Sequence, residues 1–193
     1  MIETRRRVFF SFHYQATDTW KVQNIRNIGF LERNKPVQPN HWEEIQKKGD
    51  GEIKKWIDNE MENCTCVIVF IGEHTAKRKF VQYEIARAWN TGKGLFGIYI
   101  RDLKDSNCLK GMIEGKNPFN RFLIKTRDSE YSLETVVSTK RPDPNDARND
   151  IEKHLAQWVE DAISLRAGAK YKDSQCVFTV AHGMFGESMD KIE

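Results

Sequence analysis

The sequence predicts an α/β fold in which a mainly parallel sheet is covered by helices on both faces. Three short apolar runs, at residues 8–12, 64–71 and 95–100, are typical of buried strands, and amphipathic segments lie between them. The run at 64–71 is apolar at consecutive positions, as expected of a central strand that is covered on both sides. Strands and helices that alternate in this way form βαβ units, and such units build parallel sheets.

The first half of the chain follows this pattern element by element. Residues 8–12 are rich in aromatic side chains and are predicted to form the first strand. Trp20, Val22 and Ile25 recur at loose helical spacing, so a helix is expected there. The elements predicted after it are a loop or short edge strand at 34–40, a helix at 41–62 interrupted near 49–51, and the central strand at 64–71.

The second half continues the alternation and closes with an amphipathic helix. The elements predicted here are a helix at 80–89, a strand at 95–100, a loop at 101–121, a short strand at 122–124, an irregular or hairpin segment at 125–140, and a helix at 146–167. A chain of 193 residues suits one domain, which we place at residues 1–167. Residues 168–193 are predicted to be a C-terminal extension of unknown structure, in which 176–181 forms an extra strand or a tail.

Composition narrows the classes of function. The net charge is only +3 and no basic run, including the one at 5–7, is longer than three residues, so no nucleic-acid partner is expected. No apolar run approaches the roughly 18 residues of a membrane span, and no signal peptide is recognised. We therefore expect no membrane partner and predict a cytoplasmic location. The four cysteines are expected to be reduced, because their spacing fits no zinc site.

Several common chemistries lack their motifs. The sequence has no glycine-rich dinucleotide fingerprint after the first strand, no phosphate-binding P-loop, no nucleophile elbow and no zinc-protease helix motif. The five histidines are not paired at metal-ligand spacing, so no metal site is predicted.

The candidate site lies at the carboxyl ends of the predicted strands, because parallel sheets bind their ligands there. Phe80 and Glu84 are four residues apart on the helix after the central strand and share one of its faces. There the phenylalanine ring could stack on a heteroaromatic group, and the carboxylate could bind ribose hydroxyls and stabilise positive charge. From spacing alone, however, a surface glutamate beside a half-buried phenylalanine is the better interpretation.

Beyond this spacing, the sequence resembles the Toll/interleukin-receptor (TIR) domains of the ThsB-like branch of bacterial Thoeris antiphage defence. The matching segments occur in the order and spacing of that family and cover roughly residues 6–165. They are residues 8–14, 26–27, 69–72, Thr75, Arg78, 80–85, 97–100 and 115–119. The resemblance implies a flavodoxin-like TIR fold with about five mainly parallel strands. Residues 168–193 have no counterpart in it.

The resemblance also implies an activity. NAD+ would be the substrate rather than a cofactor, and no other cofactor is implied. The nicotinamide–ribose bond would be cleaved, as in an NAD+ nucleosidase or ADP-ribosyl cyclase. The product would be an ADP-ribose-derived signalling nucleotide that activates a separate ThsA-like effector after phage infection.

Two site residues follow from the same resemblance, and three more follow from their position at the end of the first strand. Glu84 falls on the catalytic glutamate of the family, and Phe80 falls where many catalytic TIR domains carry tryptophan. Ser11, Phe12 and His13 end the first strand and are predicted to line the substrate site. The local alternatives are a strand-end cap for Ser11, a core position for Phe12 and a loop position for His13.

Two alternatives remain at this stage: a non-catalytic TIR module for protein interaction, and a hydrolase that only depletes NAD+. One glutamate serves cyclisation, hydrolysis and transfer to a small acceptor alike, so the sequence does not decide the product. Activation is expected to involve self-association of TIR domains or a phage-derived trigger. The segment 34–51 is predicted to supply the wall that excludes water from the site.

Overall fold

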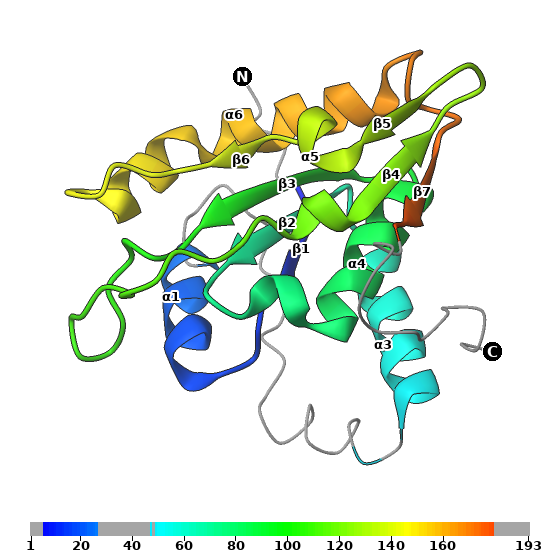
Figure 1. The fold of residues 1–193 in the computed structure, drawn as a ribbon. Helices are drawn as coiled ribbons and strands as arrows, with labels where there is room; N and C mark the ends of the chain where they lie inside the picture. Colours follow the sequence, from blue (N-terminus) through cyan, green and yellow to red (C-terminus); the bar gives the residue numbers. More distant parts are fainter. Residues whose placement is uncertain (1–5, 27–46, 48, 180–193) are drawn as a thin grey trace.

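A parallel sheet with the strand order β1-β2-β3-β6 lies at the centre of the molecule (Figure 1). The computed structural model describes residues 6–26, 47 and 49–179. The four strands are β1 (Val8–Ser11), β2 (Cys66–Ile71), β3 (Gly94–Tyr99) and β6 (Thr139–Lys140). Ser11 at the end of β1 pairs with Val69, so the carboxyl ends of these strands form one edge.

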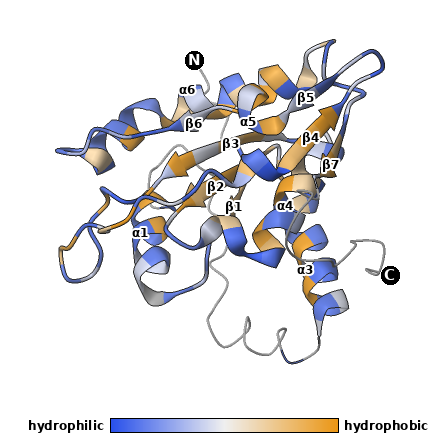
Figure 2. Ribbon diagram, in the orientation of Figure 1, coloured by the Kyte–Doolittle hydropathy of each residue, from blue (hydrophilic) through white to orange (hydrophobic). Residues whose placement is uncertain are grey.

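Helices cover both faces of this sheet, as predicted. The four long helices are α1 (Ala16–Arg26), α3 (Asp50–Glu62), α4 (Lys79–Asn90) and α6 (Ala147–Ala167). Successive residues of β2 alternate between two apolar cores. Val67 lies in the core shared with α3 and α4, whereas Ile68 lies in the core shared with α1 and α6. This two-sided burial explains why β2 is apolar at every position, and Figure 2 shows the apolar strands at the centre.

The structure contains a second, antiparallel sheet, which the sequence did not predict. It has the order β5-β4-β7 and contains β4 (Phe122–Lys125), β5 (Glu130–Ser132) and β7 (Gln175–Phe178). The strand predicted at 122–124 therefore exists but does not join the parallel sheet, which has four strands in the described part of the chain. Phe122 and Ile124 are buried while their neighbours are more exposed, and such one-sided burial suits an antiparallel sheet with one face on the core.

Residues 168–179 pack against the end of α4, and the segment predicted as a strand or a tail contains β7 (Gln175–Phe178), whereas 180–193 lie outside the described residues. The Trp89 indole nitrogen donates a hydrogen bond to Ser174 Oγ at 3.0 Å. The Asn90 side chain acts like a neighbouring strand: its amide donates to the Cys176 carbonyl at 3.1 Å, and its carbonyl accepts from the Cys176 nitrogen at 2.6 Å. These contacts hold the carboxyl end of the helix that carries the candidate glutamate.

Two short 3-10 helices, η1 (Thr75–Lys77) and η2 (Pro118–Arg121), and the one-turn α5 (Leu133–Val136) complete the elements. Among the described residues, no helix is long and apolar enough to cross a lipid bilayer. The predicted edge segment at 34–40 lies outside the described residues.

Candidate functional site

A cavity of about 290 Å³ opens where the loop after β1 meets the start of α4. It lies at the carboxyl edge of the parallel sheet, as predicted. The residues that line it are Phe12, His13, Tyr14, Arg78, Lys79, Phe80, Val81 and Glu84. Four of the five predicted site residues are in this set, and the fifth, Ser11, contacts Glu84 directly. Residues from two segments about 70 positions apart in the sequence therefore meet in one site.

Glu84 is buried, contrary to the interpretation that spacing alone favours. Glu84 is only 7% exposed, because α4 packs on the sheet and the end of β1, with Ser11, lies against its carboxyl group. Phe80, one turn earlier, is half-buried, as expected. The helix thus presents a ring and a carboxyl group to the same cavity.

The Glu84 carboxyl group rests against the end of β1. The Ser11 hydroxyl is completely buried and donates a hydrogen bond of 2.5 Å to Glu84 Oε2. Burial raises the pKa of Glu84 from 4.5 to about 8, while the Ser11 hydrogen bond acts in the opposite direction and lowers it. A carboxyl group that titrates near neutral pH at the base of a cleft is typical of a functional site.

The loop after β1 supplies three rings to the cavity. Phe12 is buried in the core with α1 and stacks on Tyr14, with 4.3 Å between ring centroids and 26° between planes. Burial, the charge of Arg78 and the charge of His74 lower the pKa of His13 to about 4, so its imidazole is neutral at physiological pH. Its Nδ1 atom is buried and has no hydrogen-bond partner in the described structure.

The turn before α4 is held by a buried threonine. Thr75 Oγ1 donates to the Phe70 carbonyl at 3.1 Å and accepts from the Gly72 nitrogen at 2.9 Å. This turn places Arg78 and Lys79 at the start of α4, where both are exposed at the mouth of the cavity. The Lys79 ammonium pairs with Asp50 at the start of α3, which connects the two helices.

Sequence reasoning missed Tyr14, Arg78, Lys79 and Val81 as lining residues. Tyr14, Arg78 and Val81 lie in the segments that resemble the TIR family, but the resemblance assigns them no role, and Lys79 lies beside them at a helix start. The predicted wall at 34–51 is described only at 47 and from Gly49 onward, and 34–46 and 48 lie outside the described residues. Gly49 has a φ of 92°, which suits glycine and explains the predicted interruption of the helix before Asp50.

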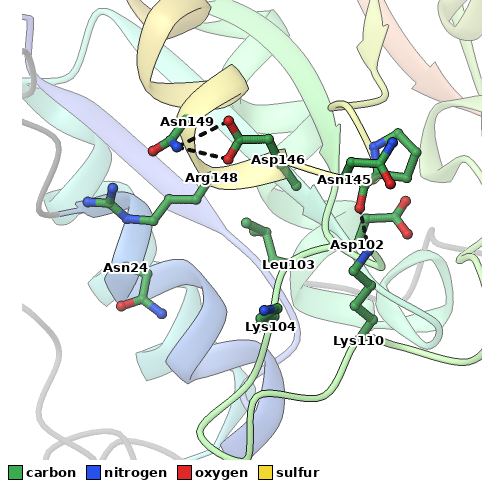
Figure 3. Close-up of a pocket in the computed structure, with 11 residues that line it drawn as sticks. Asn24, Asp102, Leu103, Lys104, Lys110, Asn145, Asp146, Arg148 and Asn149 are labelled. Atoms are coloured by element: carbon green, nitrogen blue, oxygen red, sulfur yellow. Dashed lines mark hydrogen bonds between the residues drawn. The ribbon is translucent and has the colours of Figure 1, made fainter.

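A second cavity, of about 280 Å³, lies at the start of α6 (Figure 3). It contains none of the predicted site residues, and several of its charged groups bind neighbouring groups. Lys110 donates to the Pro144 carbonyl, Arg148 pairs with Glu152, and Asp146 accepts from Asn149. We therefore place the candidate site at Glu84. In the described part of the chain, no cluster of histidine, cysteine and acidic residues is arranged to hold a metal ion.

The parallel sheet with helices on both faces is the α/β, flavodoxin-like architecture of TIR domains. Residues 9–105 match the family described as "Thoeris protein ThsB, TIR-like domain", and the chain belongs to this family.

A relative from Bacillus cereus (strain MSX-D12), named "Putative cyclic ADP-D-ribose synthase ThsB1", is 33% identical over 120 residues. The aligned region covers 60% of this chain and 62% of that protein.

Proposed function

We propose that the protein cleaves the bond between nicotinamide and ribose in NAD+, with Glu84 as the catalytic carboxylate. The observation that carries the proposal is the Glu84 carboxyl group, buried at the base of a cavity beside the ring of Phe80 and bound by Ser11. The family match and the name of the Bacillus cereus relative support the same class of reaction.

The chemistry requires one well-placed negative charge. The C1′–N bond breaks, its electron pair leaves with neutral nicotinamide, and the positive charge passes to the ribose as an oxocarbenium ion. A carboxylate that binds the ribose hydroxyls and faces this charge stabilises the transition state. An acceptor oxygen or nitrogen then forms a new bond to C1′ and releases its proton to solvent.

Glu84 must be ionised to act in this way. In the ligand-free protein its pKa of about 8 keeps much of it protonated at pH 7. The nicotinamide ring of NAD+ is cationic, and a cation beside a buried carboxyl group lowers its pKa. We therefore expect the substrate to promote the ionisation that its own cleavage needs, so kcat should titrate at a lower pH than kcat/KM.

The other predicted residues take supporting roles in the proposal. Phe80 provides a plane on which the nicotinamide stacks, and Ser11 orients the carboxylate through its hydrogen bond. Phe12 and His13 also line the cavity, where they would contact the substrate. Each role is consistent with the position of the side chain in the cavity.

The proposed product is an ADP-ribose-derived nucleotide, formed when a group of the same molecule attacks C1′, and its proposed target is a ThsA-like effector. Hydrolysis to linear ADP-ribose is the alternative product. We further propose that self-association of the domains or a phage-derived trigger activates the enzyme, since a signal-forming enzyme must not consume NAD+ in uninfected cells.

The decisive experiment is product analysis by mass spectrometry after incubation with NAD+, with and without lysate of phage-infected cells, over a wide range of protein concentration. We expect nicotinamide and an ADP-ribose-derived nucleotide from the wild type. We expect a loss of about 10²–10³ in rate for Glu84→Gln.

The matched control is Glu62→Gln, because Glu62 is exposed at the end of α3 and does not line this cavity. Equal rates for the wild type and Glu84→Gln would refute the role of Glu84. Absence of turnover under every condition would instead favour a module for protein interaction.

A further inference from the structure

The two ends of the cavity around Glu84 carry different chemical groups. Its base holds the carboxyl group, bound by the buried Ser11, whereas its mouth holds the exposed cations of Arg78 and Lys79. Arg78 precedes Glu84 by six residues, which corresponds to about 9 Å along a helix axis. A ligand that spans the cavity would therefore meet a carboxyl group at one end and positive charge at the other.

Of the two cations, Arg78 is the one available to a ligand. Lys79 is held by its ion pair with Asp50 and lies 5.8 Å from the centre of the Phe80 ring. No acidic side chain in the described structure pairs with the Arg78 guanidinium, although Arg78 lines the cavity. A guanidinium presents several N–H donors in a planar fork, which matches the oxygens of a phosphate group.

His13 faces the same part of the cavity. The guanidinium of Arg78 is close enough to influence the charge of its imidazole. Its Nδ1 atom is buried without a hydrogen-bond partner in the described structure, so a ligand in the cavity would meet the imidazole at Nε2. A neutral imidazole there can donate a hydrogen bond to a phosphate oxygen without placing a second positive charge near the oxocarbenium ion.

We propose that Arg78, with His13 beside it, binds the diphosphate of NAD+ and so directs the nicotinamide riboside end of the substrate toward Glu84 and Phe80. This inference rests on the proposed function and deepens it. It makes the enzyme selective for substrates that carry phosphate next to the scissile riboside. A phosphate held at the cavity mouth leaves one ribose between it and the carboxylate at the base.

The test compares Arg78→Ala with Lys77→Ala, which removes the same charge one residue earlier from an exposed position outside the cavity. We expect Arg78→Ala to raise the KM for NAD+ by about 10- to 100-fold, as for the loss of a charge-assisted contact, with little change in kcat. Arg78→Lys should retain part of the affinity. With nicotinamide riboside, which has no phosphate, the wild type and Arg78→Ala should have equal kcat/KM.

Two results would overturn the inference while leaving the role of Glu84 intact. One is a KM for NAD+ that is the same in Arg78→Ala and Lys77→Ala. The other is an equal loss of activity of Arg78→Ala toward NAD+ and nicotinamide riboside. If the wild type does not cleave NAD+, the proposed function fails. The diphosphate site is then tested separately, by measuring how far ADP-ribose raises the melting temperature of each protein. Protection that Arg78→Ala abolishes and Lys77→Ala retains supports this site, and any other pattern refutes it.

Discussion

Replacement of the buried carboxyl group by an amide, Glu84→Gln, should alter stability in a manner that depends on pH. The glutamine keeps the size of the side chain and can still accept the hydrogen bond from Ser11. It removes only the ability to ionise. The unfolding free energies of the two proteins should therefore differ by the cost of ionising Glu84 in its buried position.

The sign and size of this cost follow from the two pKa values. Below pH 4.5 the carboxyl group is protonated in both the folded and the unfolded chain. As the pH rises toward 8, the unfolded chain loses this proton and the folded protein keeps it, because burial raises the pKa of Glu84 to about 8. The stabilisation by protonated Glu84 is then lost progressively up to about pH 8, and at about 1.4 kcal/mol per pH unit it amounts to on the order of 5 kcal/mol.

The assay is urea unfolding of the wild type and Glu84→Gln at intervals from pH 5 to pH 9. The free-energy difference between the two proteins isolates this one group, because all other titrations are common to both. It should increase in favour of the variant up to about pH 8 and then remain constant. The exposed Glu62→Gln serves as the control for the loss of one surface carboxyl group. A difference for Glu84→Gln that does not change with pH would show that the carboxyl group is not buried as the structure has it.

Three further predictions concern activity. Ser11→Ala removes a hydrogen bond that lowers the pKa of Glu84, so the pH profile of kcat/KM should shift to higher pH. An unchanged profile would show that this hydrogen bond has no influence on the ionisation of Glu84. Phe80→Ala should reduce NAD+ turnover more than Phe80→Trp, which keeps a stacking plane. Melting temperatures of the variants serve as the control for folding. Equal activity of Phe80→Ala and the wild type would show that the substrate does not stack on this ring. Specific activity should rise with protein concentration in parallel with light scattering, because association is expected to complete the site; constant high activity of strictly monomeric protein would refute the association requirement.

Much of the architecture could be predicted from the sequence because it depends on local patterns. The consecutive apolar residues of β2 reflect burial on two faces, and the helical spacing of Val81, Ile85 and Ala88 reflects burial on one. The edge of the sheet at which the cavity forms follows from the parallel topology alone. The position of Glu84 one turn after Phe80 follows from the helical period.

The features that the sequence did not predict depend on contacts between segments that are distant in the sequence. The interpretation of Glu84 as a surface residue failed because its burial depends on the end of β1, 73 residues away, where Ser11 donates its hydrogen bond. A periodic pattern within α4 contains no information about that strand. Likewise, an isolated apolar run at 122–124 does not indicate its partner, and only β5 and β7 place it in a second sheet.

The sequence by itself thus determined the fold class, the edge that holds the site and the residue types that gather there, since these follow from periodicity and strand direction. The tertiary structure decided the electrostatic state of the site. The raised pKa of Glu84 and the lowered pKa of His13 both arise mainly from desolvation, which depends on what the folded chain places around each group. Arg78, to which the family resemblance assigns no role, acquires a proposed role because the fold places it at the mouth of the same cavity.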